Sequence, residues 1–153
     1  MRFIGKIDYS GNSNTFGKVI KVLPSDFMAN EEPGVTKTLQ FVDNDASGIK
    51  PGDNGTELLA FVSVPEGMKA THVDIYSTAN VGVIVHEESI SSNVAWSGGS
   101  AATDLAGGSG VANTQIDLSA DVDSTATNML AIKVTLTSTS QRIWGGTVTI
   151  AAQ

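Results

Sequence analysis

The stretch Leu130-Ala131-Ile132-Lys133-Val134-Thr135-Leu136-Thr137 decides the fold class of this chain. Its apolar side chains at every second position alternate with mostly polar ones, so an extended segment has one apolar and one polar face. This is the period of a half-buried β-strand, because successive side chains of a strand point to opposite faces. The stretch therefore predicts a strand whose apolar face covers a core.

The same period recurs along most of the chain. Further strands are predicted at residues 3–9, 16–23, 37–42, 58–64, 72–76, 81–85, 115–118 and 147–150. Turn residues separate many of them, as at Pro33-Gly34, Pro51-Gly52 and Pro65-Glu66-Gly67. Such spacing is typical of sandwiches and barrels. We expect an all-β fold, an antiparallel, jelly-roll-like β-sandwich of eight to ten strands, in one domain over residues 1–153.

Two segments depart from the period of two. Residues 25–30 follow Pro24, and we expect them to form one helical turn with Ser25 as its cap. Residues 97–110 hold five glycines in fourteen positions, which makes their ordering entropically costly. The sequence predicts a flexible loop there, and long loops of this kind are usually functional or disordered.

Composition excludes several classes of function. The chain of 153 residues has no cysteine, and therefore no disulfide, thiolate metal ligand or cysteine nucleophile. Its net charge of −7 and its lack of basic runs disfavour nucleic acid and anionic membranes as partners. The first residues lack the apolar core of a secretory signal, and no stretch reaches the roughly 18 apolar residues of a membrane span. We therefore expect synthesis in a cytoplasm.

The sequence contains no signature of catalysis. It lacks the Gly-x-Ser-x-Gly motif of a nucleophilic serine and the Gly-Lys-Ser/Thr ending of a phosphate-binding loop. Glu87 and Glu88 are adjacent on a strand and point to opposite faces, whereas Asp121 and Asp123 fall in a predicted connector. The prediction is a non-enzymatic protein without a cofactor.

Two groups of residues raise the question of a metal ion. His72 and His86 could combine with nearby acids across neighbouring strands, but no zinc spacing is present, so solvent-facing positions are preferred. The run from Asp43 through Asp45 to Gly48 begins like an EF-hand loop. Its twelfth position is Asn54, where a bidentate Glu is needed, so a surface turn is preferred.

Trp96, Arg142 and Trp144 are the candidate interface residues. Exposed tryptophans anchor protein interfaces or stack on sugar rings. Trp96 precedes the predicted loop, while Arg142 and Trp144 share one face of a predicted strand. The following Gly145-Gly146 indicates a β-bulge that redirects this strand. The sequence leaves open whether Trp144 is a core residue or an interface anchor.

A resemblance to a known family rests on three stretches. They are Gly11-Asn12-Ser13-Asn14-Thr15-Phe16-Gly17-Lys18-Val19-Ile20-Lys21-Val22-Leu23-Pro24 with Phe27-Met28-Ala29-Asn30, then Val64-Pro65-Glu66-Gly67-Met68-Lys69-Ala70-Thr71-His72-Val73-Asp74-Ile75-Tyr76, and Ile143-Trp144-Gly145-Gly146-Thr147-Val148-Thr149-Ile150-Ala151. Together they reach from near one end of the chain to the other. They resemble small structural proteins of marine tailed bacteriophages.

The resemblance implies an all-β virion component, and we expect a capsid decoration (cement) protein that binds the major capsid protein. It further implies a homo-oligomer, with a trimer favoured, on the outer capsid surface of the virion. It assigns no individual functional residue. The alternative hypothesis is a tail- or fibre-associated module that binds host-surface glycans. A third is a small enzyme with a pocket lined by His72, His86 and Glu88.

Overall fold

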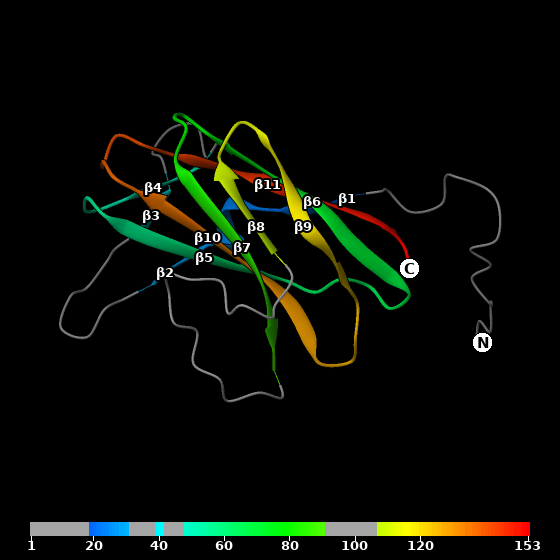
Figure 1. Ribbon diagram of the computed structural model, residues 1–153. Coiled ribbons are helices and arrows are strands. Elements are labelled where there is room, and N and C mark those ends of the chain that lie inside the picture. Colours follow the sequence, from blue (N-terminus) through cyan, green and yellow to red (C-terminus); the bar gives the residue numbers. More distant parts are fainter. Residues whose placement is uncertain (1–18, 31–38, 42–47, 91–106) are drawn as a thin grey trace, which may run out of the picture.

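The structure is a computed structural model that describes residues 19–30, 39–41, 48–90 and 107–153. These residues form eleven β-strands in two antiparallel sheets that pack together, and one short 3-10 helix (Figure 1). The expected β-sandwich is confirmed, with one strand more than the upper expectation. No helix in these ranges is long and apolar enough to cross a membrane.

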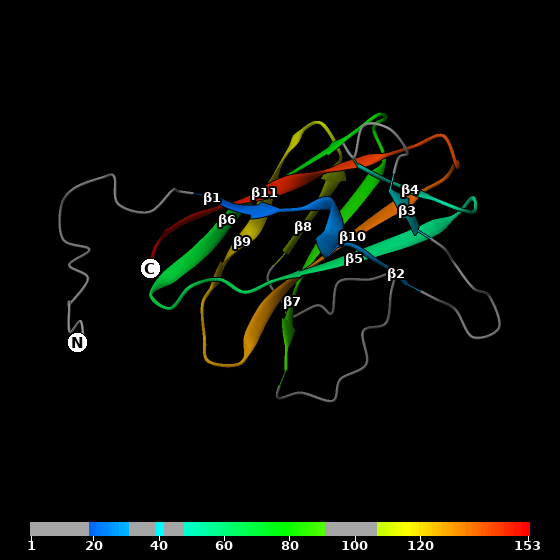
Figure 2. The ribbon, with the colours of Figure 1, turned by 180° about the vertical axis from the view of Figure 1, so that it is seen from behind.

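Sheet A contains six strands. They are β1 (Val19–Val22), β3 (Leu39–Phe41), β4 (Ile49–Pro51), β6 (Met68–Ser77), β9 (Gln115–Asp123) and β11 (Ile143–Ala152). Their order is β3-β4-β11-β6-β9, and β1 also pairs with β11. Because β6 occupies one edge of β11, β1 and β4 share the other edge. Figure 2 shows β1 (blue) running along β11 (red).

Sheet B contains five strands in the order β2-β5-β10-β7-β8. They are β2 (Met28–Ala29), β5 (Thr56–Val62), β7 (Gly82–Ser89), β8 (Gly107–Val111) and β10 (Asn128–Leu136). The turn between β5 and β6 is the predicted one, since the amide of Met68 donates to the carbonyl of Pro65 at 3.0 Å and Gly67 has a φ of 77°.

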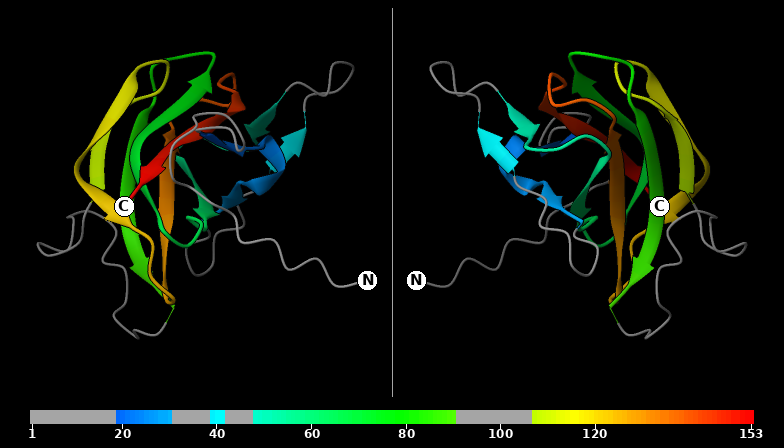
Figure 3. Two further views of the ribbon diagram at one scale, coloured as in Figure 1. Left: turned by 90° about the vertical axis from the view of Figure 1, so that its right-hand side faces the viewer. Right: turned by 90° about the vertical axis from the view of Figure 1, so that its left-hand side faces the viewer.

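The pairing pattern identifies a jelly roll. The strands from β4 to β11 pair as β4·β11, β5·β10, β6·β9 and β7·β8, like one long hairpin. This hairpin is folded over so that β11 also meets β6 and β10 also meets β7. The result is the double-sheet arrangement of a jelly roll. The two sides of the sandwich, with β8 and β9 on one and β1 to β4 on the other, are seen in Figure 3.

The core lies between the two sheets. The alternating apolar residues of β10 point into it, and Leu130, Ile132, Val134 and Leu136 are each 0% exposed. The same core includes, from the other strands of both sheets, Val22, Leu58, Val73, Val83, Val85, Val122 and Ile143, among others. The strand predicted from the deciding stretch is thus confirmed, and its apolar face is buried. It is not half-buried as expected, because Ala131 and Lys133 on the other face are 0% and 4% exposed.

The predicted helical turn needs correction. It is a 3-10 helix over Pro24–Asp26, which begins one residue earlier than expected and ends before β2. Ser25 is not its cap. Instead the carboxylate of Asp26 accepts a hydrogen bond from the amide of Leu23 at 2.8 Å, and the chain then extends because β2 pairs with β5.

The C-terminal end of the predicted loop at 97–110 also needs correction. Residues 107–110 belong to the edge strand β8 rather than to a loop. Glycine serves packing here, because a Cβ on Gly108 would lie 2.7 Å from the carbonyl oxygen of Asp117 in β9. A Cβ on Gly110 would likewise lie 2.9 Å from Cγ1 of Ile116. A strand without side chains at these positions can therefore approach β9 closely.

Several predictions fall outside the described residues. They are the strand at 3–9, the segments 16–18 and 37–38 with residue 42, the turn at Pro33-Gly34, the part of the loop at 97–106, Trp96, and the Asp43 and Asp45 turn.

Candidate functional site

Trp144 is placed on the outer face of sheet A by a β-bulge. Ile143 pairs with Ser77 and Gly145 with Tyr76, so Trp144 is the extra residue between two registered pairs. The bulge predicted from the glycine pair is confirmed. The Trp144 ring lies beside Gly48, where a Cβ would be 2.9 Å from its Cδ1. Trp144 is 46% exposed, so it is not a core residue.

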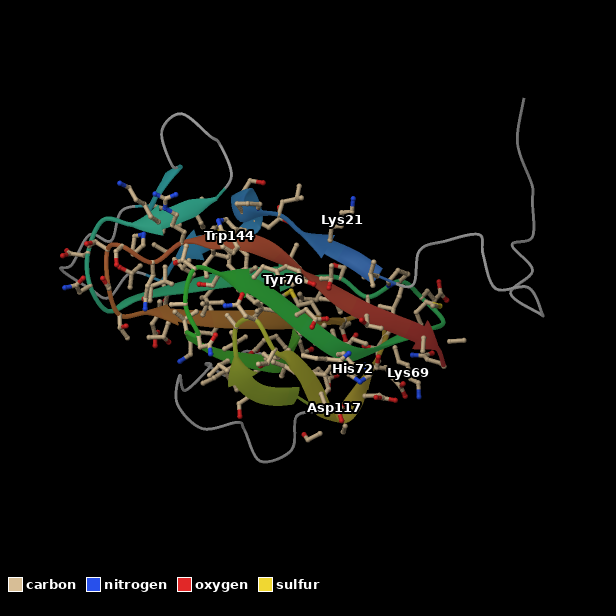
Figure 4. All side chains as sticks on the ribbon, turned by 90° about the horizontal axis from the view of Figure 1, so that it is seen from above. Lys21, Lys69, His72, Tyr76, Asp117 and Trp144 are labelled. Carbon is tan, nitrogen blue, oxygen red and sulfur yellow. The ribbon has the colours of Figure 1, made fainter. Side chains whose placement is uncertain are left out.

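Two further apolar side chains lie next to Trp144 on the same face. Tyr76 pairs with Gly145 from β6, and Leu23 follows Val22, which pairs with Gly146 from β1. Leu23 is 51% exposed and Tyr76 is 48% exposed. We call Leu23, Tyr76 and Trp144 the Trp144 patch. Figure 4 looks onto this face, with Trp144 and Tyr76 near the middle of the view and Lys69, His72 and Asp117 to their right.

Gly145 lies at the centre of the Trp144 patch, where it is buried against the segment that follows β1. It has a φ of 116°, and a Cβ there would lie 2.5 Å from the carbonyl oxygen of Val22. A side chain is therefore excluded by both conformation and space. The backbone of Val22 and the ring of Pro24 occupy the space that a side chain would need, so Gly145 lets the segment after β1 pack closely on β11.

The side-chain polar atoms of the Trp144 patch form no hydrogen bond with the described part of the chain. Neither the hydroxyl of Tyr76 nor the indole N–H of Trp144 makes a hydrogen bond to a described residue. Large aromatic side chains on a rigid support, with free polar tips, are the residues that most often dominate binding at protein interfaces.

Two basic residues lie beside the Trp144 end of the patch. Arg142 precedes β11, and its amide donates to Oγ1 of Thr78 at 3.0 Å while its carbonyl accepts from the amide of Thr78 at 3.1 Å. Lys50 follows Ile49, which pairs with Ile143, so Lys50 comes opposite Arg142. The sequence prediction selected Arg142 and Trp144 but missed Leu23, Lys50 and Tyr76, which only the strand register brings together.

The other end of this face is charged and internally paired. Nε2 of His72 lies 3.3 Å from the Asp117 carboxylate, and Nζ of Lys69 lies 2.6 Å from that of Asp121. The hydrogen bond to Asp121 raises the pKa of Lys69. Asp121 and Asp123 belong to β9 rather than to a connector, because Val122 between them is buried. Acidic side chains on this edge strand discourage another strand from pairing with it.

His86 does not lie at a solvent-facing position, and that expectation was wrong. It is 4% exposed, on the outer face of β7 in sheet B. His72 lies on the outer face of sheet A, so the two histidines point away from each other. Among the described residues, no three His, Asp or Glu side chains come together as a metal site. The hypothetical pocket lined by both histidines is therefore not formed.

A partly buried ion pair lies on the same outer face of sheet B. Nζ of Lys133, a residue 4% exposed, is 3.2 Å from Oε1 of Glu57. Glu57 also accepts a hydrogen bond from Nδ2 of Asn30 at 3.1 Å, which ties the segment after β2 to β5 and β10. Because each charge offsets the other, the pair serves the cohesion of sheet B rather than a reaction.

Burial of His86 predicts a pH-dependent stability. Desolvation lowers the pKa of His86 below its ordinary 6.5, with a further contribution from Lys133 and an opposing one from Glu88. Between the two pKa values the unfolded chain binds more protons than the folded one. The free energy of unfolding should therefore fall as pH drops from about 7.5 to about 5.5, measured by urea denaturation.

The matched comparison uses the two histidines. In His86→Gln this pH-dependent loss should be reduced, whereas in His72→Gln it should persist. Equal pH dependence in His86→Gln and in the unsubstituted protein would contradict the assignment.

Comparison with known proteins adds no relative. No family model matches the chain, and no curated protein sequence is significantly similar to it.

Proposed function

We propose that this chain is a non-enzymatic phage virion protein, a capsid decoration protein that docks on major capsid subunits through the Trp144 patch. The observation that carries the proposal is this cluster of Leu23, Tyr76 and Trp144, each 46–51% exposed on one sheet face. Exposed apolar groups that gather in one place mark contact surfaces. A sheet with a well-packed core beneath it supplies the rigid support that such a contact needs.

The location of the patch in the sequence supports the phage assignment. Each of the three stretches that resemble phage structural proteins contributes one of its side chains: Leu23 from the first, Tyr76 from the second and Trp144 from the third. The fold is compatible with this role, because jelly rolls occur in viral capsid domains, although a fold alone does not determine function.

The proposed protein acts as one of many copies. A decoration protein on an icosahedral head meets the same surface repeatedly, so modest contacts add up through multivalency. We propose a homo-oligomer, with a trimer favoured, on the outer surface of the head. In this arrangement one copy clamps neighbouring capsid subunits and the assembly resists their separation.

The test is binding to heads assembled without this chain. The purified protein should co-sediment with them and raise the temperature at which they release DNA, because a ligand that binds only the intact state stabilises it. Finding the protein only on tails, or absent from virions, would contradict the proposal.

A second candidate function is a tail- or fibre-associated module that binds host-surface glycans. The observation in its favour is that Tyr76 and Trp144 expose aromatic surface on one sheet face, where a sugar ring could stack. A glycan array would decide this point. Specific hits that are lost in Trp144→Ala would favour the glycan hypothesis, and an array without hits would count against it.

A further inference from the structure

We infer that the surface bound by the Trp144 patch is an acidic protein surface, on which carboxylates surround the apolar group that the patch contacts. This inference rests on the proposed function and names the chemistry of its partner. The supporting observation is that the lysine and arginine side chains are unevenly distributed over the described part of the chain.

The described residues contain five lysines and arginines. Two of them, Lys69 and Lys133, are held in ion pairs with Asp121 and Glu57. The three others, which form no ion pair with a described carboxylate, are Lys21, Lys50 and Arg142. Among the described residues, these three side chains are therefore the lysines and arginines without an ion-pair partner.

The strand register places these three cations around the Trp144 patch. Lys21 on β1 is opposite Thr147 and comes two residues before Leu23, which follows the strand. Lys50 and Arg142 face each other across β4 and the start of β11, beside Trp144. Since β1 and β4 lie along the same edge of β11, the cations flank the patch from both ends of that edge. Figure 4 shows Lys21 on the face that carries Tyr76 and Trp144.

Two carboxylates, those of Asp26 and Asp74, also lie near the patch in the strand order, so the three cations outnumber them three to two. The side chain of Asp26 accepts the amide hydrogen of Leu23 at 2.8 Å, so it is engaged by the backbone. Asp74 is on β6, with Thr147 between it and Lys21 in the cross-strand row. Neither lies within the 4.0 Å that defines an ion pair with a cation of this group.

The positive charge beside the patch contrasts with the acidic character of the whole chain, and this contrast favours an anionic partner. The chain carries a net charge of −7, so most of its surface repels an acidic partner. A cationic rim around the apolar contact attracts such a partner at one place only, which orients the encounter. Rim charges of this kind act chiefly on the association rate and its salt dependence.

A protein surface fits the patch better than an anionic polysaccharide does. Leu23 is aliphatic and supplies no ring for stacking, so only Tyr76 and Trp144 offer aromatic surface in the patch. A mixed aliphatic and aromatic surface of this kind suits the apolar side chains of a protein partner. A flat series of aromatic rings would be the expected platform for sugar.

The test compares two charge reversals with the same change in net charge. Lys50→Glu lies at the rim of the patch, whereas Lys69→Glu lies at the far end of the same face. Their association with immobilised heads assembled without this chain is measured at low and high NaCl (about 50 and about 300 mM). We expect Lys50→Glu to lower the association rate constant about tenfold at low salt, and Lys69→Glu by less than about twofold.

The outcomes separate this inference from the proposed function. If the unsubstituted protein binds heads but both variants associate equally fast, the acidic-partner inference is wrong while the capsid function stands. If the protein binds no heads, the capsid function itself fails. In that case the protein is tested for binding to alginate, a carboxylated polysaccharide. Binding to alginate that is lost in Lys50→Glu would contradict a protein partner and favour an anionic glycan.

Discussion

Replacing Gly146 with alanine is expected to lower the free energy of unfolding by about 3 kcal/mol, because the position has no room for a methyl group. A Cβ there would overlap the carbonyl oxygen of Asp74 and would lie 2.7 Å from Cδ1 of Ile75. Gly146 is paired with Ile75 in the interior of sheet A. Asp74 and Ile75 belong to β6, which is hydrogen-bonded to β11 on one side and to β9 on the other, so β6 cannot easily move away from an added methyl group. Calorimetry should show a decrease in Tm of about 10 °C.

The matched control is Gly82→Ala in β7. No atom lies within 4 Å of a Cβ at Gly82, and its φ is not positive. This variant should stay within about 1 kcal/mol of the unsubstituted protein. If Gly146→Ala were as stable as Gly82→Ala, the close approach of β11 to β6 beside the bulge would be contradicted.

Replacing Trp144 with alanine is expected to weaken binding to capsids about thirtyfold or more while the fold is retained. Truncating a tryptophan at the centre of an interface typically costs about 2 kcal/mol or more, which corresponds to that change in affinity. Because Trp144 is 46% exposed, its removal affects the core much less than it affects a contact surface. Tyr76→Ala should act in the same direction, and both are measured by co-sedimentation titration.

Phe61→Ala is the control for this loss of aromatic surface. Phe61 is 42% exposed, close to the exposure of Trp144, but it belongs to β5 of sheet B. Its replacement should leave capsid binding unchanged. Equal binding by Trp144→Ala and Phe61→Ala would show that the Trp144 patch is not the docking surface.

Features that depend on local sequence were predictable. The alternation in β10 gave the correct buried face, since burial follows directly from the period of two. The glycine pair at 145 and 146 predicted the bulge, because a bulge needs backbone conformations that glycine adopts. The turn at Pro65 to Gly67 followed from similar local chemistry.

Features that depend on distant segments were not predictable. Leu23, Tyr76 and Trp144 are far apart in sequence and meet only through the register of β1, β6 and β11. The burial of His86 reflects its surroundings on sheet B rather than its strand pattern, which had indicated an exposed position. The strand β8 was missed because its glycines resemble a loop, although their lack of side chains is what lets the strand approach β9.

The role of the Trp144 patch in capsid assembly is tested most directly by a cryo-EM map of intact phage particles from cells that make this chain. We predict density for the sandwich on the outside of the head, with the outer face of sheet A at Trp144 and Tyr76 against a major capsid subunit. Density on the tail alone, or on the head with this face turned to solvent, would contradict the account.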